Sequence, residues 1–300
     1  MSLWIPVTIA AAVFQTVRFM LQKFLSTGHL SASGATFARF VYSAPLILGG
    51  LAVYLASTGT PLPDFSVAFA GYAMLGGVSQ ILATVCVVLL FKQRNFAVGI
   101  TFKKTEVIQT VLVGLLLLGE GVSPGGLFAI LLGLAGVFLL SKTPGDTGEW
   151  WRHLTNRASG LGLGSGILFA FSAVSYRGAT LQLEIADAVL RAGITLAVVV
   201  TFQTVIMAAW LALRDPGQIL AVWQTRRVAL WIGLTSMGGS LCWFIAFALQ
   251  NAAYVKALGQ VELLLSLLAS VFFFREKISA RELGGMAFLV ASILLIVLLI

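Results

Sequence analysis

Two carboxylates, Glu106 and Glu262, lie within long apolar stretches of the sequence, where they could carry a proton or bind a substrate amine. An ionisable group in the hydrocarbon core costs roughly 2.5–3.5 kcal/mol on insertion scales, so such a residue usually faces a partner or a cavity. Lys103 precedes Glu106 by one helical turn and can pair with it, whereas Gly259 occupies the equivalent position before Glu262. The alternative is structural, with each carboxylate fixed by a basic group from another helix, such as Arg18 or Lys256.

Polar residues recur at helical spacing in several of the apolar stretches. In the stretch 3–25, intervals of 7, 3 and 4 residues place four polar side chains on one face: Thr8, Gln15, Arg18 and Gln22. Such a face lines a hydrated cavity or contacts another helix, because lipid has no hydrogen-bonding groups. Serine and aromatic residues share a face in the stretch 227–249, which suits an amphipathic solute, although ordinary packing uses the same pattern. The candidate substrate-binding residues are Gln15, Arg18, Gln22, Gln80, Thr84, Lys103, Glu106, Ser172, Tyr176, Ser240, Trp243, Tyr254, Lys256, Gln260 and Glu262.

The charges inside the apolar stretches are mostly positive. The basic ones are Arg18, Arg39, Lys103, Lys104, Arg191 and Lys256, against the carboxylates Glu106 and Glu262. Asp187 is expected to offset Arg191 as an i, i+4 pair. The remaining surplus favours a substrate that bears a carboxylate or a phosphate. Arg39 and Arg191 lie near the ends of their stretches, so we expect both to extend towards the membrane interface.

The elements that must position these residues are indicated by composition. Of 300 residues, 59% are hydrophobic and only 10% are charged, and the mean hydropathy is +1.00. Soluble domains carry roughly 25% charged residues, so this composition excludes soluble enzymes, disordered chains and nucleic-acid binders. A membrane-spanning helix needs about 20 apolar residues. Ten stretches are candidates: 3–25, 32–57, 65–91, 96–118, 124–141, 159–181, 186–213, 227–249, 252–274 and 280–300.

The sequence matches itself when it is shifted by 156 positions. Pairs of uncommon residues coincide in this alignment: Cys86 with Cys242, Asn95 with Asn251, Glu106 with Glu262, and Glu120 with Glu276. We expect an all-α integral membrane protein with ten transmembrane helices, built as two five-helix repeats, 1–141 and 159–300, joined by a linker loop, 142–158. Because five is odd, the repeats would enter the membrane in opposite directions, as in many secondary transporters that bind substrate between the halves.

Basic residues concentrate in alternate loops. Those in or beside the odd-numbered loops are Lys23, Lys92, Arg94, Lys142, Arg152, Arg157, Arg214, Arg226, Arg227, Arg275, Lys277 and Arg281. The even-numbered loops carry almost none, with Arg177 as the one borderline residue. The positive-inside rule therefore predicts odd loops in the cytoplasm and both termini outside the cell inner membrane.

The chain resembles the EamA domains of the drug/metabolite transporter superfamily. The resemblance lies in KKTEVIQTVLVGLLLLGEGVSPGGLFAILLGLAGVFLL, residues 103–140, and in GQVELLLSLLASVFFFREKISARELGGMAFLVASILLIVLL, residues 259–299. A Gly-Glu turn followed by serine is typical of the family; Glu120–Ser123 matches it, whereas Glu276–Ser279 has Arg275 in place of the glycine. The resemblance implies ten helices and metabolite transport, with amino-acid export as the leading expectation. It also implies cytoplasmic termini, which conflicts with the distribution of basic residues.

Other function classes have little support in the sequence. It has no G-x-x-x-x-G-K-[ST] motif, and its two histidines, His29 and His153, lie in expected loops. Cys86 and Cys242 lack metal or redox spacing and are expected to pack as small core residues. We therefore expect no enzyme activity, no cofactor, no metal and no nucleic-acid partner. The expected partners are a small-molecule substrate and membrane lipid, with the chain functional as a monomer. The main alternative is transport of another anionic or amphipathic metabolite, such as a nucleotide derivative, a lipid-linked sugar or a drug.

Overall fold

The computed structural model describes residues 2–28, 30–91, 102–141, 157–265 and 279–300, which form helices and no strand. The helices are α1 (Trp4–Gly28), α2 (Ala32–Thr58), α3 (Val67–Phe91), α5 (Glu106–Leu118), α6 (Pro124–Ser141), α8 (Arg157–Leu181), α9 (Ala188–Arg214), α10 (Gly217–Gln224), α11 (Arg226–Leu249), α12 (Ala252–Gly259) and α14 (Ala280–Leu299). Most of the expected linker, the start of the stretch 96–118 and the end of 252–274 lie outside the described residues.

Seven of these helices are long and apolar enough to cross a membrane: α1, α2, α3, α8, α9, α11 and α14. The apolar helices α5 and α6 are shorter. Large apolar side chains stand on the outside of the bundle, among them Val67, Leu116 and Leu213, each more than 80% exposed. Lipid solvates such a surface and water does not. The chain is therefore an all-α, multi-pass membrane protein, as the composition predicted.

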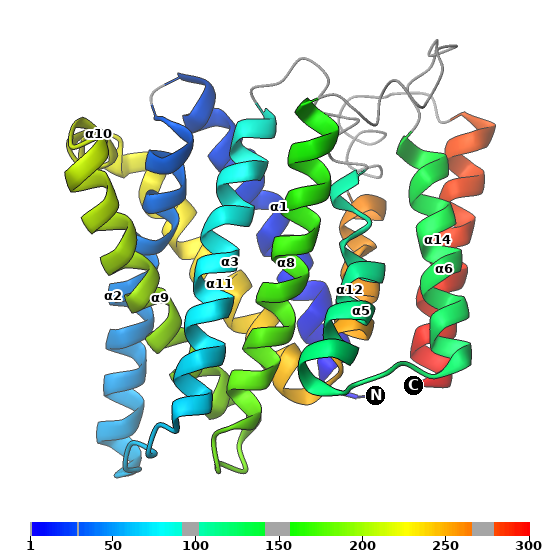
Figure 1. Ribbon diagram of the computed structural model, residues 1–300, viewed down its shortest axis with the longest axis horizontal. Helices are drawn as coiled ribbons and strands as arrows, with labels where there is room; N and C mark the ends of the chain where they lie inside the picture. The colour runs from blue at the N-terminus through cyan, green and yellow to red at the C-terminus, as the bar shows by residue number, and fades with distance from the viewer. Residues whose placement is uncertain (1, 29, 92–101, 142–156, 266–278) are drawn as a thin grey trace.

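Both ends of the chain lie at the same end of the bundle (Figure 1). Helices α1, α3 and α9 finish at the opposite end, and α8, α11 and α14 start there (Figure 1). The basic residues of these helix ends include Lys23, Arg157, Arg214, Arg226 and Arg281. The end opposite the termini is therefore the positively charged end of the described bundle.

Side-chain caps define where two of the helices begin. Ser279 and Glu282 form a capping box at the start of α14, in which each side chain bonds the backbone N–H of the other. At the start of α9 the Asp187 carboxylate accepts a 2.8 Å hydrogen bond from the Val189 N–H. The expected ion pair between Asp187 and Arg191 is not among the ion pairs of the described residues.

Two of the expected spans are interrupted, although the sequence predicts a continuous helix in each. A turn at Lys104 and Thr105 precedes α5, and a turn at Gln260 separates α12 from the helical residues 261–265. At the first turn the Thr105 hydroxyl donates to the Phe102 carbonyl at 2.7 Å, a local bond that competes with continuation of the helix. The turns at Lys104 and Gln260 are 156 positions apart, the same offset at which the sequence matches itself.

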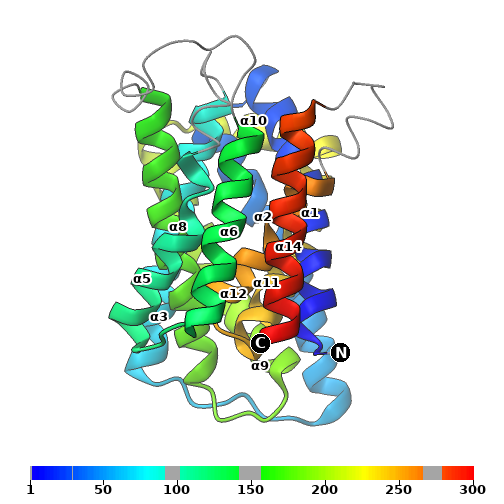
Figure 2. The same cartoon turned by 90° about the vertical axis from the view of Figure 1, so that its right-hand side faces the viewer.

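Helices α6 and α14 pack against each other at the edge of the bundle (Figures 1 and 2). The Ser292 hydroxyl of α14 donates to the Ala129 carbonyl of α6 at 2.6 Å. Gly136 of α6 lies so close to α14 that a Cβ atom there would stand 2.8 Å from the Gly285 oxygen. Close backbone approach at small residues is a common basis of helix packing in membranes.

Replacing Gly136 with alanine is expected to destabilise the protein by about 1–3 kcal/mol, the usual cost of overpacking a close contact. The neighbouring backbone cannot move aside as a flexible side chain would. Gly284 is a matched control on the facing helix, because a Cβ atom there would meet nothing within 4 Å. Thermal unfolding in detergent tests this prediction. Equal midpoints for Gly136→Ala and Gly284→Ala would contradict the packing described here.

Candidate functional site

A polar cavity lies at the centre of the bundle, among α1, α2, α3, α8, α11 and α12. Its empty volume is about 460 Å³ with its opening included. The lining residues are Gln15, Arg18, Arg39, Gln80, Phe169, Ser172, Ala173, Tyr176, Gly239, Ser240, Trp243, Phe244, Phe247 and Lys256. Polar and aromatic side chains thus share one space, and they come from residues 15–80 and residues 169–256.

Arg39 is buried at this cavity and is held by three hydroxyl groups. Its Nε donates to Ser236 at 2.9 Å, Nη1 to Thr84 at 3.0 Å, and Nη2 to Ser240 at 3.4 Å. No carboxylate of the described residues lies within ion-pair distance of it. A guanidinium has five N–H donors, so two remain for a ligand. The expectation that Arg39 extends to the membrane interface is wrong, because these hydroxyl groups hold its side chain inside the bundle.

Arg18 is the second buried guanidinium at the cavity. Its Nη1 donates to the Gln22 side-chain oxygen at 2.9 Å, and Gln22 in turn donates to the Ala35 carbonyl at 3.2 Å. The guanidinium carbon lies 4.4 Å from the centre of the Phe19 ring, within the range of a cation–π contact. Like Arg39, Arg18 forms no ion pair with any carboxylate that the structure describes.

The two buried carboxylates, Glu106 and Glu262, both pair with lysines. Glu106 lies 3.3 Å from the Lys103 amine and 3.4 Å from the Lys256 amine. Glu262 forms an ion pair with Lys104. Because Lys256 belongs to the second half of the sequence and Lys104 to the first, one carboxylate from each half pairs with a lysine from the other. Glu106 is therefore fixed by a basic group from another helix, Lys256, as in the structural alternative. It also forms the expected local pair with Lys103.

A smaller pocket connects this ion-pair cluster with the residues of the main cavity. It is lined by Gln15, Lys104, Glu106, Val107, Trp243, Lys256, Gly259, Gln260 and Glu262. Gln15 belongs to both spaces, and its amide nitrogen donates to Glu262 at 2.8 Å. Charged side chains next to the two turns therefore lie together at this smaller pocket. The buried groups around both spaces comprise five cations and two carboxylates: Arg18, Arg39, Lys103, Lys104, Lys256, Glu106 and Glu262.

The aromatic rings beside the cavity already face a lysine. The Lys256 amine lies 4.9 Å from the centre of the Trp243 ring, 5.5 Å from that of Phe169 and 5.9 Å from that of Phe247. Trp243 and Phe247 stack at 5.8 Å with 20° between their ring planes. This group of rings stabilises a buried ammonium and also forms an apolar wall of the cavity.

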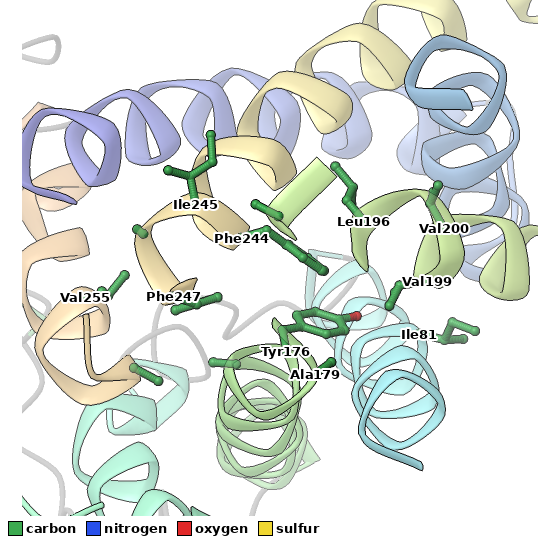
Figure 3. Packing of buried hydrophobic residues seen from close by; sticks show 14 of the residues in the cluster. Ile81, Tyr176, Ala179, Leu196, Val199, Val200, Phe244, Ile245, Phe247 and Val255 are labelled. Carbon is green, nitrogen blue, oxygen red and sulfur yellow. The ribbon is translucent and has the colours of Figure 1, made fainter. Parts of the chain in front are cut away.

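A hydrogen-bonded network closes the side of the cavity next to α3 and α9. The Tyr176 hydroxyl donates to the Gln80 side-chain oxygen at 3.0 Å, and the Gln203 amide nitrogen donates to the same oxygen at 3.0 Å. Gln203 also donates to the Gly77 carbonyl at 3.0 Å. Figure 3 shows Tyr176 of α8 facing Phe244 of α11, and their ring centres are 4.3 Å apart. The network fixes the orientation of the Gln80 amide at the wall.

The structure brings most of the predicted site residues together. Eight of them line the main cavity: Gln15, Arg18, Gln80, Ser172, Tyr176, Ser240, Trp243 and Lys256. Glu106, Gln260 and Glu262 line the smaller pocket. Gln22, Thr84 and Lys103 lie behind these as partners of Arg18, Arg39 and Glu106.

Tyr254 is placed apart from both spaces. Its hydroxyl accepts a 2.8 Å hydrogen bond from the Ser123 N–H, and its ring packs against Gly126 of α6. Tyr254 therefore lies outside the candidate site.

Sequence reasoning missed Gln203 and Phe169, which carry no charge, and undervalued Arg39. The available signal for Arg39 was its place as the eighth residue of the stretch 32–57, about two helical turns from the start of that stretch.

Comparison with known proteins identifies the fold but no family. No family model matches the chain, and no curated protein matches it. Among solved structures, 29 chains match. One of them, described only as a crystal structure of a protein, superposes with a TM-score of 0.67 and covers 97% of this chain and 99% of its own. At 17% sequence identity this similarity shows a shared fold over nearly the whole length.

Proposed function

We propose that the chain is a secondary transporter that moves small organic metabolites bearing a carboxylate, a class that includes amino acids, across the cell inner membrane. The observation that carries the proposal is the pair of buried guanidinium groups, Arg18 and Arg39, at a polar cavity inside an apolar bundle. Charged groups placed at membrane depth mark the routes of ions and substrates. An anionic group of the substrate would bind between these two side chains.

Three observations support an inverted-repeat architecture of the EamA type for this transporter. Helices α2 and α9 are both 27 residues long and start 156 positions apart, and α6 and α14 start at the same offset. The turns at Lys104 and Gln260 are separated by that offset as well. Helices α1 and α8, the first of each proposed repeat, run in opposite directions (Figure 1). Interrupted helices at corresponding positions of two halves are typical of secondary-transporter binding sites.

The orientation we propose follows from the positively charged end of the bundle. Basic residues near helix ends favour the cytoplasmic side. The two termini would then lie on the side of the membrane opposite the cytoplasm, and the C-terminal ends of α1 and α9 would face the cytoplasm. The energy source we propose is the solute gradient, because both intramembrane carboxylates are paired with lysines and would have to leave them to carry a proton.

Counterflow in proteoliposomes tests the proposed function. Vesicles loaded with unlabelled amino acids or organic anions should accumulate the labelled compound faster than empty vesicles, and faster than vesicles without protein. We expect the rate to be unchanged by an imposed pH gradient in the wild type and in Glu262→Gln. If the pH gradient stimulates only the wild type, transport is coupled to protons and is not driven by the solute gradient alone. No counterflow with any carboxylate-bearing solute would contradict the proposed function itself.

A further inference from the structure

The charges around the cavity distinguish a zwitterion from an anion. Around the two spaces five buried cations outnumber two buried carboxylates, and the main cavity itself is lined by three of these cations and, among the described residues, by no carboxylate. A zwitterionic amino acid has no net charge and would leave this surplus of positive charge unchanged. An organic anion would reduce the surplus, and a desolvated site binds most favourably the solute that compensates its charge.

The anionic end of such a solute has defined partners. Arg39 retains two N–H donors after its bonds to Ser236, Thr84 and Ser240. Arg18 uses Nη1 for its bond to Gln22 and also lines the cavity. Guanidinium forks match the geometry of carboxylate oxygens and bind them more strongly than neutral donors do.

Among the described residues that line the two spaces, the acceptors without a hydrogen-bond partner, Glu106 Oε2 and Gln260 Oε1, lie in the smaller pocket and not in the main cavity beside Arg18 and Arg39, where the amine of an amino acid would need one. Glu106 and Glu262 are each engaged by lysines. The aromatic faces of Trp243 and Phe247, which could otherwise hold an ammonium, are already approached by the Lys256 amine. An incoming ammonium would meet this like charge at close range, which is destabilising in a low dielectric.

We infer that the cavity selects organic anions that have an apolar, preferably aromatic, body and lack an ammonium group, with the anionic group between Arg18 and Arg39. The body packs against the phenylalanine and tryptophan rings that line the cavity, which are those of Phe169, Trp243, Phe244 and Phe247. Aromatic pairs of this kind stabilise the contact beyond simple burial. This inference rests on the proposed function and narrows its substrate class.

Three probes that share one phenyl body and differ in charge test the inference. They are 3-phenylpropionate, an anion; L-phenylalanine, a zwitterion; and 2-phenylethylamine, a cation. Isothermal titration of the purified full chain in nanodiscs is expected to show 3-phenylpropionate binding at least about tenfold more tightly than phenylalanine, and no binding of the amine. This comparison uses the wild type, so it does not depend on the folding of any variant. Equal or tighter binding of phenylalanine would overturn the inference.

Variants then locate the anionic group. Arg39→Gln is expected to weaken 3-phenylpropionate binding by at least about thirtyfold. Arg191→Gln is the matched control, because Arg191 lines neither space and should leave binding unchanged. Equal weakening by the two variants would overturn the placement. Counterflow separates the two levels of the proposal: phenylalanine transport without phenylpropionate binding contradicts only the inference, whereas phenylpropionate binding without transport contradicts only the proposed function.

Discussion

Arg39→Gln is expected to lower the initial rate of counterflow by about 100-fold or more while leaving the protein folded. Removing one partner of a buried, hydrogen-bonded charge pair costs about 2–5 kcal/mol. Three hydroxyl groups, from Thr84, Ser236 and Ser240, orient the guanidinium and would remain to solvate the shorter amide. The loss should therefore appear in transport more than in stability.

Arg39→Lys and Arg191→Gln are the controls for this prediction. Lysine keeps the positive charge but loses the planar fork of donors, so Arg39→Lys should retain an intermediate rate. Arg191→Gln removes an arginine that does not line the cavity and should transport at the wild-type rate. Size-exclusion profiles confirm that each variant is folded. A wild-type rate for folded Arg39→Gln would show that the guanidinium does not contact the substrate.

Glu106→Gln is expected to destabilise the protein by about 3–5 kcal/mol, because it leaves buried lysines without their counter-ion. Glu106 lies within 3.4 Å of two lysine amines, Lys103 and Lys256. The double variant Glu106→Gln, Lys256→Met removes one of the orphaned charges and should recover about half of the loss. Thermal unfolding of the single and double variants provides the comparison.

Additive effects of the two substitutions would contradict the ion pair between Glu106 and Lys256. Lys256→Met alone should be less damaging than Glu106→Gln, because Glu106 would still have Lys103 as a partner. Glu106→Gln and Lys256→Met each keep the side-chain length close to that of the original residue. The difference between their unfolding midpoints therefore reports charge pairing and not side-chain volume.

The membrane character of the fold could be predicted from sequence because apolar stretches of about 20 residues have one common use. The interruptions at Lys104 and Gln260 could not, because neither site carries proline and the local sequence is compatible with a continuous helix. At the turn of Lys104, the Thr105 hydroxyl donates a hydrogen bond to the Phe102 carbonyl, three residues back along the chain. A threonine within an apolar stretch gives no advance sign of such a bond.

The candidate site was predictable where polar residues recur at helical spacing, as at Gln15 and Arg18. It was not predictable where the partners come from distant parts of the chain. The hydroxyl groups that hold Arg39 inside the bundle belong to α3 and α11, and only tertiary packing brings them to α2. For the same reason the pair of Glu262 with Lys104 could not be derived from the local spacing around Glu262.

On the proposed function the cavity is an aqueous substrate route inside an apolar bundle, and cysteine accessibility tests this role most directly. In a variant lacking Cys86 and Cys242, Ser172→Cys places a thiol at the cavity wall of α8, and Ile167→Cys places one on its outer face. Ser172 is 2% exposed and Ile167 is 40% exposed in the structure. We predict that a charged, water-soluble thiosulfonate modifies Ser172→Cys and not Ile167→Cys, and that 3-phenylpropionate slows the reaction. Modification of Ile167→Cys with an inert Ser172→Cys would contradict the account.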